Sequence, residues 1–393
     1  MNVPPELFLG VGGLVGGFLL GRATRTRDLP GKREKGSELT FYLRGVMALL
    51  AGDRKRALED FSEALKLNSD LVEGYMAMGS LLRDTGDPAR AIRIHRGITC
   101  REDIDKEMMV QALNELVLDY RAAGLLEKAV ETCQELVKLA PKRVQSWVEL
   151  REVSEELGLW DRALEAQERI SKLTSEEAPN VKAHILTEMG KAHRERGDVK
   201  GARWAFKKAI STHKGCVDAY LQLGDLYASD GSDSKAVEVW LRILDEAPQF
   251  TFLVFDRLEH AYYRMGKVSA LEGILRQRCG DDPFSRFHLA RFLRKKGEAR
   301  EAARLLEVLV QAHPLWVEAR RELVEAYKDQ GLYQEALEVY ERSQVPEDMS
   351  GQRYECSHCG KVLEELHWRC PGCRRWDTVK MRWGPWNGRG KEK

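Results

Sequence analysis

The sequence predicts an all-α protein whose main part is a solenoid of about nine helix pairs. The first observation is a glycine that recurs at intervals of 31 to 39 residues. The second is a small residue, alanine in eight of nine cases, five residues after each glycine. The third is a helical spacing of apolar residues on both sides of each glycine. The nine glycines are Gly52, Gly86, Gly124, Gly158, Gly197, Gly231, Gly266, Gly297 and Gly331.

Each recurring residue has a physical role in a helix pair. Glycine ends the first helix because it adopts the left-handed conformation without steric cost, and alanine lets the second helix approach closely. A period near 34 residues built from paired helices is typical of the tetratricopeptide repeat family. The resemblance covers residues 38–345. A tyrosine that is expected to pack between helices recurs four residues before the glycine, at Tyr120, Tyr227, Tyr262 and Tyr327.

Composition argues against a general nucleic-acid binder. Charged residues make up 32% of the chain and nearly cancel, with a formal net charge of +1, whereas such a binder carries a basic excess. No nucleic-acid partner is therefore expected. Four of the eight cysteines, Cys100, Cys133, Cys216 and Cys279, are scattered on helical patterns and are expected to be structural. Free thiols together with a thiolate cluster favour a reducing compartment.

Residues 1–21 are predicted to form a transmembrane anchor. No charge occurs between Leu7 and Gly21, although fifteen helical residues span only about 22 Å of a hydrocarbon core of roughly 30 Å. Six basic residues follow in the juxtamembrane linker 22–37. By the positive-inside rule they keep the rest of the chain in the cytoplasm, and they suit contact with inner-membrane lipid. A cleaved signal peptide and a buried soluble segment are the alternatives.

The predicted anchor carries glycines four residues apart. Small residues on one helix face let another membrane helix approach closely, so a membrane partner is expected there. The alternative is that glycine is simply common in such helices. The packing residues are Gly12, Gly13, Gly16 and Gly17.

The first helix of each repeat is expected to line a groove that binds a partner. The predicted lining combines amide, basic and aromatic side chains, which suit an acidic or extended peptide segment. The alternative is a solvated helix face with ordinary charges. The predicted groove residues are Asn114, Arg121, Lys191, Arg194, His260, Arg264, Phe284, Phe287, Arg291, Arg294 and Lys295.

The C-terminus carries two Cys-x-x-Cys pairs separated by ten residues, which predict a tetrahedral four-thiolate metal site. The ligands are Cys356, Cys359, Cys370 and Cys373. A hinge over 346–353, a ribbon over 354–381 and a polar tail over 382–393 are predicted. So small a ribbon depends on its metal for folding free energy. Zinc and iron both accept four thiolates. We expect one structural ion, with zinc in preference to iron.

The two pairs of cysteines resemble the knuckles of rubredoxin, which read CxxCG and CPxC. The second knuckle departs from rubredoxin because Arg374 stands where a glycine follows. His358 and His367 are alternative ligands, but four cysteines already satisfy tetrahedral geometry.

Four tryptophans lie close to this site in the sequence, and so small a module cannot bury them alone. We therefore expect the ribbon to dock on the last repeats with some of these rings in the joint. The alternative is a free ribbon on a flexible linker. The tryptophans are Trp368, Trp376, Trp383 and Trp386.

No recognisable catalytic motif occurs in the chain, so a protein that is not an enzyme is predicted. Walker-type phosphate loops, HExxH, GxSxG and the dinucleotide fingerprint are absent from the sequence. Acidic pairs such as Glu155-Glu156 and Asp281-Asp282 are interpreted as solvated helix ends or loops.

The order of anchor, repeat array and metal ribbon resembles the lipopolysaccharide assembly protein B family of Gram-negative bacteria. Local strings are also similar to that family: Tyr42-Leu-Arg-Gly45-Val, Ala91-Ile-Arg-Ile-His95 and Asp119-Tyr120 with Ala123-Gly124-Leu125. The resemblance implies an inner-membrane adaptor that helps the membrane protease FtsH degrade the deacetylase that commits the cell to lipid A synthesis. It also implies a membrane sensor that contacts the anchor helix, and metal binding by the four cysteines.

Three alternatives to this adaptor stay open. A membrane scaffold would assemble lipopolysaccharide or other envelope proteins without directing proteolysis. A nucleic-acid-linked ribbon is suggested by Arg374, Arg375, Lys380 and Arg382, and its binding would fall steeply with salt. An iron redox module is suggested by the knuckle pattern.

Overall fold

The computed structural model describes residues 37–278, 280, 282–341 and 353–382. The predicted anchor with Gly12, Gly13, Gly16 and Gly17 lies outside the described residues, as do Cys279, Trp383 and Trp386. Among the residues that are described, none of the helices combines the length and apolar character needed to cross a bilayer. The first strand of the ribbon begins at residue 353 and its last strand ends at residue 382, one residue beyond each end of the predicted range 354–381.

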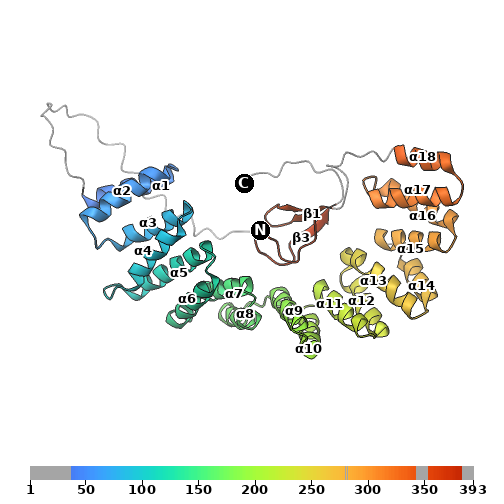
Figure 1. Cartoon of the computed structure of the whole chain (residues 1–393), viewed down its shortest axis with the longest axis horizontal. Helices are drawn as coiled ribbons and strands as arrows, with labels where there is room; N and C mark the ends of the chain where they lie inside the picture. Colours follow the sequence, from blue (N-terminus) through green and yellow to red (C-terminus); the bar gives the residue numbers. More distant parts are fainter. Residues whose placement is uncertain (1–36, 279, 281, 342–352, 383–393) are drawn as a thin grey trace. The chain divides into compact units, whose positions relative to one another are not determined.

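The fold from residue 38 to residue 341 consists of α-helices in consecutive pairs (Figure 1). A 3₁₀ helix, η2 (Pro248–Leu253), precedes α13. The helices are α1 (Glu38–Leu50), α2 (Arg54–Leu67), α3 (Val72–Asp84), α4 (Pro88–Thr99), α5 (Lys106–Ala122), α6 (Leu126–Leu139), α7 (Val144–Glu156), α8 (Trp160–Thr174), α9 (Pro179–Glu195), α10 (Val199–Thr212), α11 (Val217–Ser229), α12 (Asp233–Glu246), α13 (Phe255–Arg264), α14 (Val268–Arg278), α15 (Pro283–Lys295), α16 (Ala299–Ala312), α17 (Val317–Asp329) and α18 (Tyr333–Glu341).

The recurring glycines form the turns inside the helix pairs. All nine have φ between 66° and 93°, the left-handed region that favours glycine. At Gly231 the glycine N–H donates to the carbonyl of Ala228, and the next N–H, of Ser232, donates to the carbonyl of Tyr227. These bonds satisfy carbonyl groups that the helix end leaves open. The residue five positions later is buried in every pair, with at most 5% of its surface exposed.

The chain divides into two compact units, and the first extends to Leu81. Its described part holds α1, α2 and most of α3. Phe61 on α2 is fully buried and packs with Ala48, Ala57 and Leu81. An aromatic side chain thus fills the space that small residues leave between neighbouring helices.

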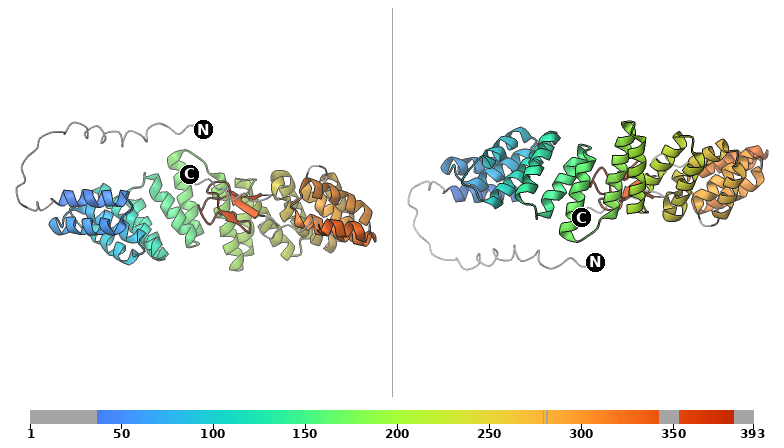
Figure 2. Two further views of the ribbon diagram at one scale, coloured as in Figure 1. Left: turned by 90° about the horizontal axis from the view of Figure 1, so that it is seen from above. Right: turned by 90° about the horizontal axis from the view of Figure 1, so that it is seen from below.

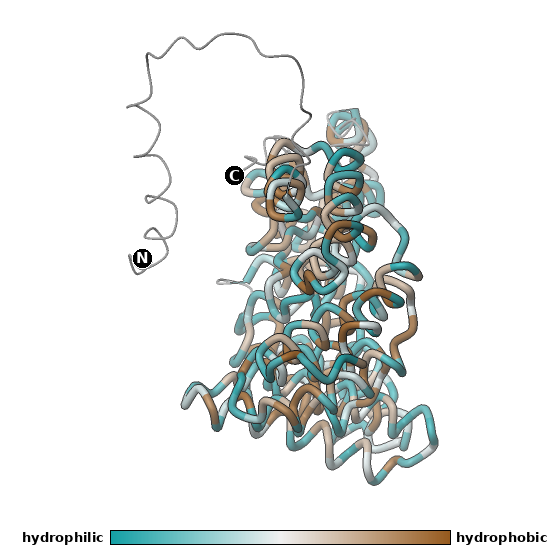
Figure 3. The backbone as a smooth tube through the Cα atoms, turned by 90° about the vertical axis from the view of Figure 1, so that its left-hand side faces the viewer, coloured by the Kyte–Doolittle hydropathy of each residue, from teal (hydrophilic) through white to brown (hydrophobic). Residues whose placement is uncertain are grey.

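The second unit runs from Leu82 and includes the C-terminal ribbon. Apolar and polar segments are interspersed along the helices, as the hydropathy colouring of Figure 3 shows. One continuous apolar core extends from Ala183 to Ala326, with Tyr220 and Trp240 almost fully enclosed. Each repeat therefore buries its apolar face against its neighbours, as a solenoid requires.

Close helix contact depends on a second set of glycines, and Gly224→Ala tests this. A Cβ at Gly224 would lie 2.1 Å from Nε1 of Trp240, so Trp240 would have to move. We expect overpacking to cost about 1–3 kcal/mol, measured as a lower midpoint of urea unfolding. Gly97 on α4 is the control, because an added Cβ there meets nothing within 4 Å. Gly97→Ala should be neutral or stabilise by up to about 1 kcal/mol; equal losses for both variants would contradict the close-contact argument.

The ribbon is a three-stranded antiparallel sheet with strand order β2-β1-β3. Its strands are β1 (Arg353–Cys356), β2 (Val362–Leu363) and β3 (Val379–Arg382). Tyr354 pairs with Leu363 on one side and Met381 on the other. In Figures 1 and 2 the ribbon lies beside the middle helices of the second unit, which agrees with the contacts described below.

Candidate metal centre and its contacts with the repeats

Two backbone turns of the same kind hold the four cysteines. In the first, the N–H of Cys356 donates to the carbonyl of Lys361, and the N–H of Gly360 donates to the carbonyl of Cys356. The second repeats this pattern fourteen residues later, with Cys370, Arg374 and Arg375 in the matching places. Both turns also aim backbone N–H groups at sulfur: Cys359 N lies 3.5 Å from Cys356 Sγ, and Gly372 N lies 3.3 Å from Cys370 Sγ.

The four sulfur atoms have the spacing of a tetrahedral metal site. All lie within 4.8 Å of one another; Cys356 Sγ is 3.6 Å from Cys373 Sγ, and Cys359 Sγ is 3.7 Å from Cys370 Sγ. Metal–sulfur bonds of about 2.3 Å place tetrahedral ligands about 3.8 Å apart. These cysteines therefore fit one ion, and four protein ligands leave no position for a substrate. The thiolate set suits zinc and iron alike.

Hydrogen bonding favours the thiolate form of Cys356, the form that binds metal. Burial would raise its pKa, but the Thr378 hydroxyl, 3.3 Å from the sulfur, and the N–H groups of Cys359 and His358 together lower the pKa to about 6. A ligand that ionises easily binds metal at neutral pH with little competition from protons.

Arg374 occupies the left-handed position that glycine fills in the first turn. Gly360 has φ 72° and Arg374 has φ 58°. A side chain in this region carries a backbone cost of about 1–3 kcal/mol. The Arg374 guanidinium pairs with the carboxylate of Glu156 on α7. The departure from the rubredoxin pattern thus places a cation at the joint between the ribbon and the repeats.

Ion pairs connect the ribbon with the end of α7. Arg369 Nη2 lies 2.7 Å from Glu155 Oε2, and the Glu155 side chain is only 2% exposed. Burial raises the pKa of Glu155, and Arg369 and Arg151 offset this only in part. The interpretation of Glu155-Glu156 as a solvated helix end is therefore wrong. The pair faces ribbon arginines that lie more than 200 positions later in the sequence, so local pattern could not reveal the contact.

His184 on α9 is the centre of the aromatic part of the joint. Its ring stacks on Trp376 with centroids 4.6 Å apart and an interplanar angle of 8°. Its Nε2 lies 2.6 Å from Asp377 Oδ1, and its Nδ1 lies 3.9 Å from Cys216 Sγ. Burial would lower its pKa, but the bonds with Asp377 and Cys216 raise the pKa to about 10. His184 is therefore protonated at neutral pH.

The ribbon docks on the middle repeats, so the expectation that it docks on the last repeats is wrong. Trp368 lies 5.3 Å, centroid to centroid, from Phe250 in η2, and Phe252 packs against the ribbon core around Tyr354. The expectation that tryptophans enter the joint is confirmed for Trp368 and Trp376. Aromatic and acidic surface on α7, α9 and η2 attracts the ribbon, whereas the prediction used only closeness in the sequence.

Most predicted groove cations lie in ion pairs with carboxylates of neighbouring helices. Arg121 Nη2 is 2.6 Å from Glu156, and Lys191 Nζ is 2.7 Å from Asp218. Their charge is thus largely offset inside the array, and partner binding by these residues stays a prediction. The other pairs are Arg264 with Asp233, Arg291 with Asp256, Arg294 with Glu322 and Asp329, and Lys295 with Glu259.

The remaining groove residues differ in environment. Arg194 donates to Gln222, His260 is exposed, and Asn114 is half-buried. Phe284 and Phe287 are 6% and 9% exposed, so the prediction that they line an open groove is wrong. Both pack against the Trp316 ring within the core, because they lie on the face of α15 that meets the next repeat.

The residues that hold the ribbon were not predicted as site residues; they are His184, Glu155, Phe250 and Phe252. One signal was available for two of them: the segment after Pro248 carries two phenylalanines and forms η2, an element that the regular repeat does not predict. His184 gave no such signal, because a histidine in an apolar helical pattern reads as a core residue.

Two local strings of the sequence, around His95 and around Asp119, meet inside the second unit. His95 Nδ1 lies 2.6 Å from Asp119 Oδ2, and both side chains are fully buried. Arg83 adds a second bond to Asp119 at 2.9 Å and one to Glu115 at 2.7 Å. These strings therefore encode a buried polar contact between α4 and α5.

Family models match three segments of the chain. Residues 354–380 match the rubredoxin metal binding domain, and residues 187–249 match the tetratricopeptide repeat. Residues 284–345 match the bacterial transcriptional activator domain. The fold and the site thus define a tetratricopeptide repeat protein with a C-terminal rubredoxin-type metal-binding domain.

Similarity to curated proteins extends over almost the whole chain. Lipopolysaccharide assembly protein B of Escherichia coli K12 is 26% identical over 377 residues, which cover 93% of this chain and 94% of that protein. The protein of that name from Haemophilus influenzae is 24% identical over 381 residues, with the same coverage. Among solved structures, a tetratricopeptide repeat protein from Parabacteroides merdae aligns with a TM-score of 0.36 and 12% identity, covering 76% of this chain and 98% of that one. The chain is thus similar to lipopolysaccharide assembly protein B over almost its whole length, and its C-terminal segment matches the rubredoxin metal binding domain.

Proposed function

We propose that the protein is a membrane-anchored cytoplasmic adaptor that regulates lipopolysaccharide biosynthesis. It would present the deacetylase that commits the cell to lipid A synthesis to the membrane protease FtsH. Residues 1–21 would hold the chain in the inner membrane as a single span, with a membrane sensor of lipopolysaccharide as a further partner of that helix. The name of the curated relatives supports a role in lipopolysaccharide biosynthesis. The basic linker supports an orientation with the repeats in the cytoplasm.

The observation that carries this proposal is the attachment of the metal ribbon to the middle of the repeat array. Arg369, Arg374 and Asp377 all contact helices of the array, so metal binding is coupled to the surface that the repeats present. A four-thiolate ion without an open position suits a structural role in such a surface. The anchor would raise the concentration of that surface near a membrane protease.

A scaffold for envelope biosynthesis proteins is the second candidate, because repeat arrays bind partners without directing their degradation. The two candidates differ in one partner, the protease. Crosslinking and pull-down from native membranes separate them, with wild-type protein compared with the Cys356→Ser/Cys370→Ser double variant. We expect FtsH and the deacetylase together with the wild type and neither with the double variant.

Cys100→Ser is the matched control for this experiment, because Cys100 is an exposed thiol outside the metal cluster. It should recover both partners at the wild-type level. Recovery of biosynthetic enzymes without FtsH would favour the scaffold. Equal recovery of both partners with the double variant would refute a necessary role of the ribbon.

A further inference from the structure

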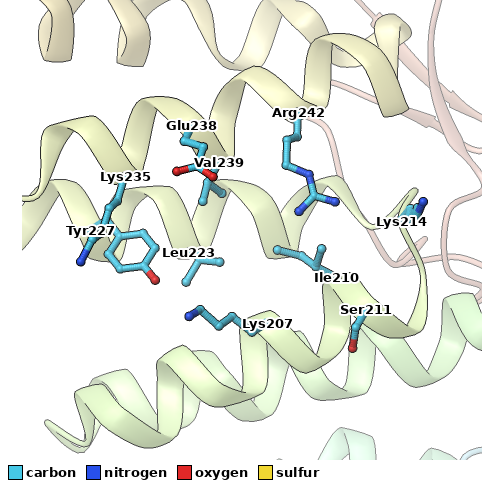
Figure 4. Close-up of a pocket in the computed structure, with 10 residues that line it drawn as sticks. All are labelled: Lys207, Ile210, Ser211, Lys214, Leu223, Tyr227, Lys235, Glu238, Val239 and Arg242. Atoms are coloured by element: carbon cyan, nitrogen blue, oxygen red, sulfur yellow. The ribbon is translucent and has the colours of Figure 1, made fainter.

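A pocket of about 490 Å³ lies between the second helices of two neighbouring repeats, away from the metal centre. Figure 4 shows Lys207 of α10 and Arg242 of α12 on opposite sides of the gap, with Ile210 and Leu223 between them. Lys235 and Tyr227 lie near one end, and Lys214 lies at the other. Four cations and one acid, Glu238, therefore surround this space.

The pocket cations have no acidic partner among the described residues. No carboxylate of that part of the chain lies within 4.0 Å of the charged nitrogens of Lys207, Lys214, Lys235 or Arg242. Two of them rest instead over aromatic rings: Lys235 Nζ lies 5.9 Å from the centre of the Tyr227 ring, and Arg242 Cζ lies 5.2 Å from that of Tyr220. Such contacts hold the side chains over a ring without neutralising them.

A comparison of α10 with α15 shows that cations on these two helices of the array differ in pairing. Both helices carry four cations and no acidic residue. On α15, the side chains of Arg291, Arg294 and Lys295 all meet carboxylates of α13 or α17. On α10, the one ion pair among the described residues joins Arg203 to Asp230 at 3.7 Å. The cations of the predicted groove on α15 are thus paired with carboxylates, whereas the cations of the pocket are not.

The wall of the pocket is apolar between its charges. Ile210 and Leu223 are buried beneath it, and Val239 is half-buried beside them. A small inorganic anion would use the cations but not this wall. A peptide that carries carboxylates on both sides of an apolar side chain would use both, because its acids would meet separate lysines while its apolar group covered the wall.

We propose that this pocket binds an acidic peptide segment of a protein partner, with an apolar residue between its carboxylates. The proposal rests on the adaptor role proposed above and moves the partner site from the first-helix groove to the second helices α10 and α12. In the groove, the ribbon already covers surface of α7 and α9. The pocket is on the other helix of the pair and is open.

Selection from a random twelve-residue peptide display library tests the proposal without knowledge of the partner. The target is the full-length protein in phosphatidylcholine nanodiscs, which add no net lipid charge. Peptides that also bind the Lys207→Glu/Lys235→Glu/Arg242→Glu variant are removed. We expect the recovered peptides to be enriched in Asp and Glu around an apolar residue. A synthetic copy should bind the triple variant at least about tenfold more weakly, because several ion pairs become repulsive.

A salt titration and a control variant test whether the synthetic peptide binds through the charges of the pocket. Binding of the synthetic peptide should weaken several-fold between 50 and 300 mM NaCl, because its charges are exposed and screened. Arg93→Glu/Arg96→Glu is the control, because these arginines are exposed on α4; it should bind the peptide like the wild type. Far-UV circular dichroism establishes that both variants keep their helices.

Three outcomes would overturn the proposal. In the first, the recovered peptides show Asp and Glu only at library frequency. In the second, the acidic peptides bind the triple variant as well as the wild type. In the third, inorganic pyrophosphate binds the wild type, and not the triple variant, while no peptide is enriched; the pocket would then be a phosphate site. The selection contains neither protease nor deacetylase, so its failure would leave the adaptor proposal to the crosslinking experiment.

Discussion

Replacing Cys356 and Cys370 with serine is expected to remove the metal and unfold the ribbon while the helices persist. Each knuckle loses one of its two sulfurs, and the remaining pair cannot complete a tetrahedral site. Metal binding to structural four-ligand sites supplies on the order of 10 kcal/mol to the folding of small domains, far more than the ribbon's small core can supply. Metal analysis of the purified protein should fall from one ion per chain to none.

The loss should be confined to the ribbon and its joint. Hydrogen exchange of β1 and β3 should become as fast as in an unfolded chain, and Trp368 and Trp376 should become accessible to quenchers. Far-UV circular dichroism should change little, because the helices of each repeat pack on neighbouring repeats. Cys100→Ser should keep the metal. A double variant that retains one ion per chain would contradict the four-thiolate assignment.

The sequence predicted the parts of this fold that depend on local requirements. A glycine must stand where the chain takes φ near 75°, as at Gly331, and a small residue must stand where two helices touch, as at Ala236. Both requirements recur in every helix pair, so they appear as a period. The metal ligands were predicted for the same reason, because Cys-x-x-Cys is a short turn in which spacing alone brings two sulfurs together.

The position of the ribbon could not be predicted in this way, because it depends on contacts between distant segments. Arg369 pairs with Glu155, and Asp377 with His184, and neither partner differs locally from an ordinary helix residue. The same limit applied to the groove. Counting back from each glycine placed Arg294 on the correct helix, but only the structure shows that Glu322 and Asp329 lie beside it. Whether a cation in a repeat array is paired depends on the side chains of the neighbouring repeat.

Two residues at the joint combine unusual backbone with a contact to the array. Arg374 and Asp377 have φ of 58° and 57°, and their side chains meet Glu156 and His184. Backbone strain of this kind persists where surrounding contacts hold it. The joint is therefore a specific arrangement rather than a chance contact of two surfaces, and His184 is the residue through which it can be tested.

Replacing His184 should weaken the joint in two separable steps. His184→Phe keeps a flat ring against Trp376 but leaves Asp377 without its partner, at an expected cost of about 1–3 kcal/mol. His184→Ala also removes the stacked ring and should cost more. The measurement is hydrogen exchange of β1 and β3 in the metal-loaded protein, where faster exchange reports opening of the joint. Val199→Ala, at a partly exposed position on α10, is the control and should not change it.

The same histidine should make the joint sensitive to alkaline pH. Its pKa is about 10 in the joint and has a model-compound value of 6.5 when free, so the protonated form stabilises the docked ribbon. This contribution is fully present below about pH 6.5 and is lost as pH rises through about 10, a difference on the order of a few kcal/mol. Wild-type protein should therefore open increasingly between pH 7 and 10 relative to His184→Phe, which has no proton to lose there. Thiols and lysines that do not contact His184 titrate in both proteins and cancel in the comparison, whereas Cys216 belongs to the contact that is tested. Parallel pH profiles for the two would show that the His184–Asp377 contact does not depend on a charged histidine.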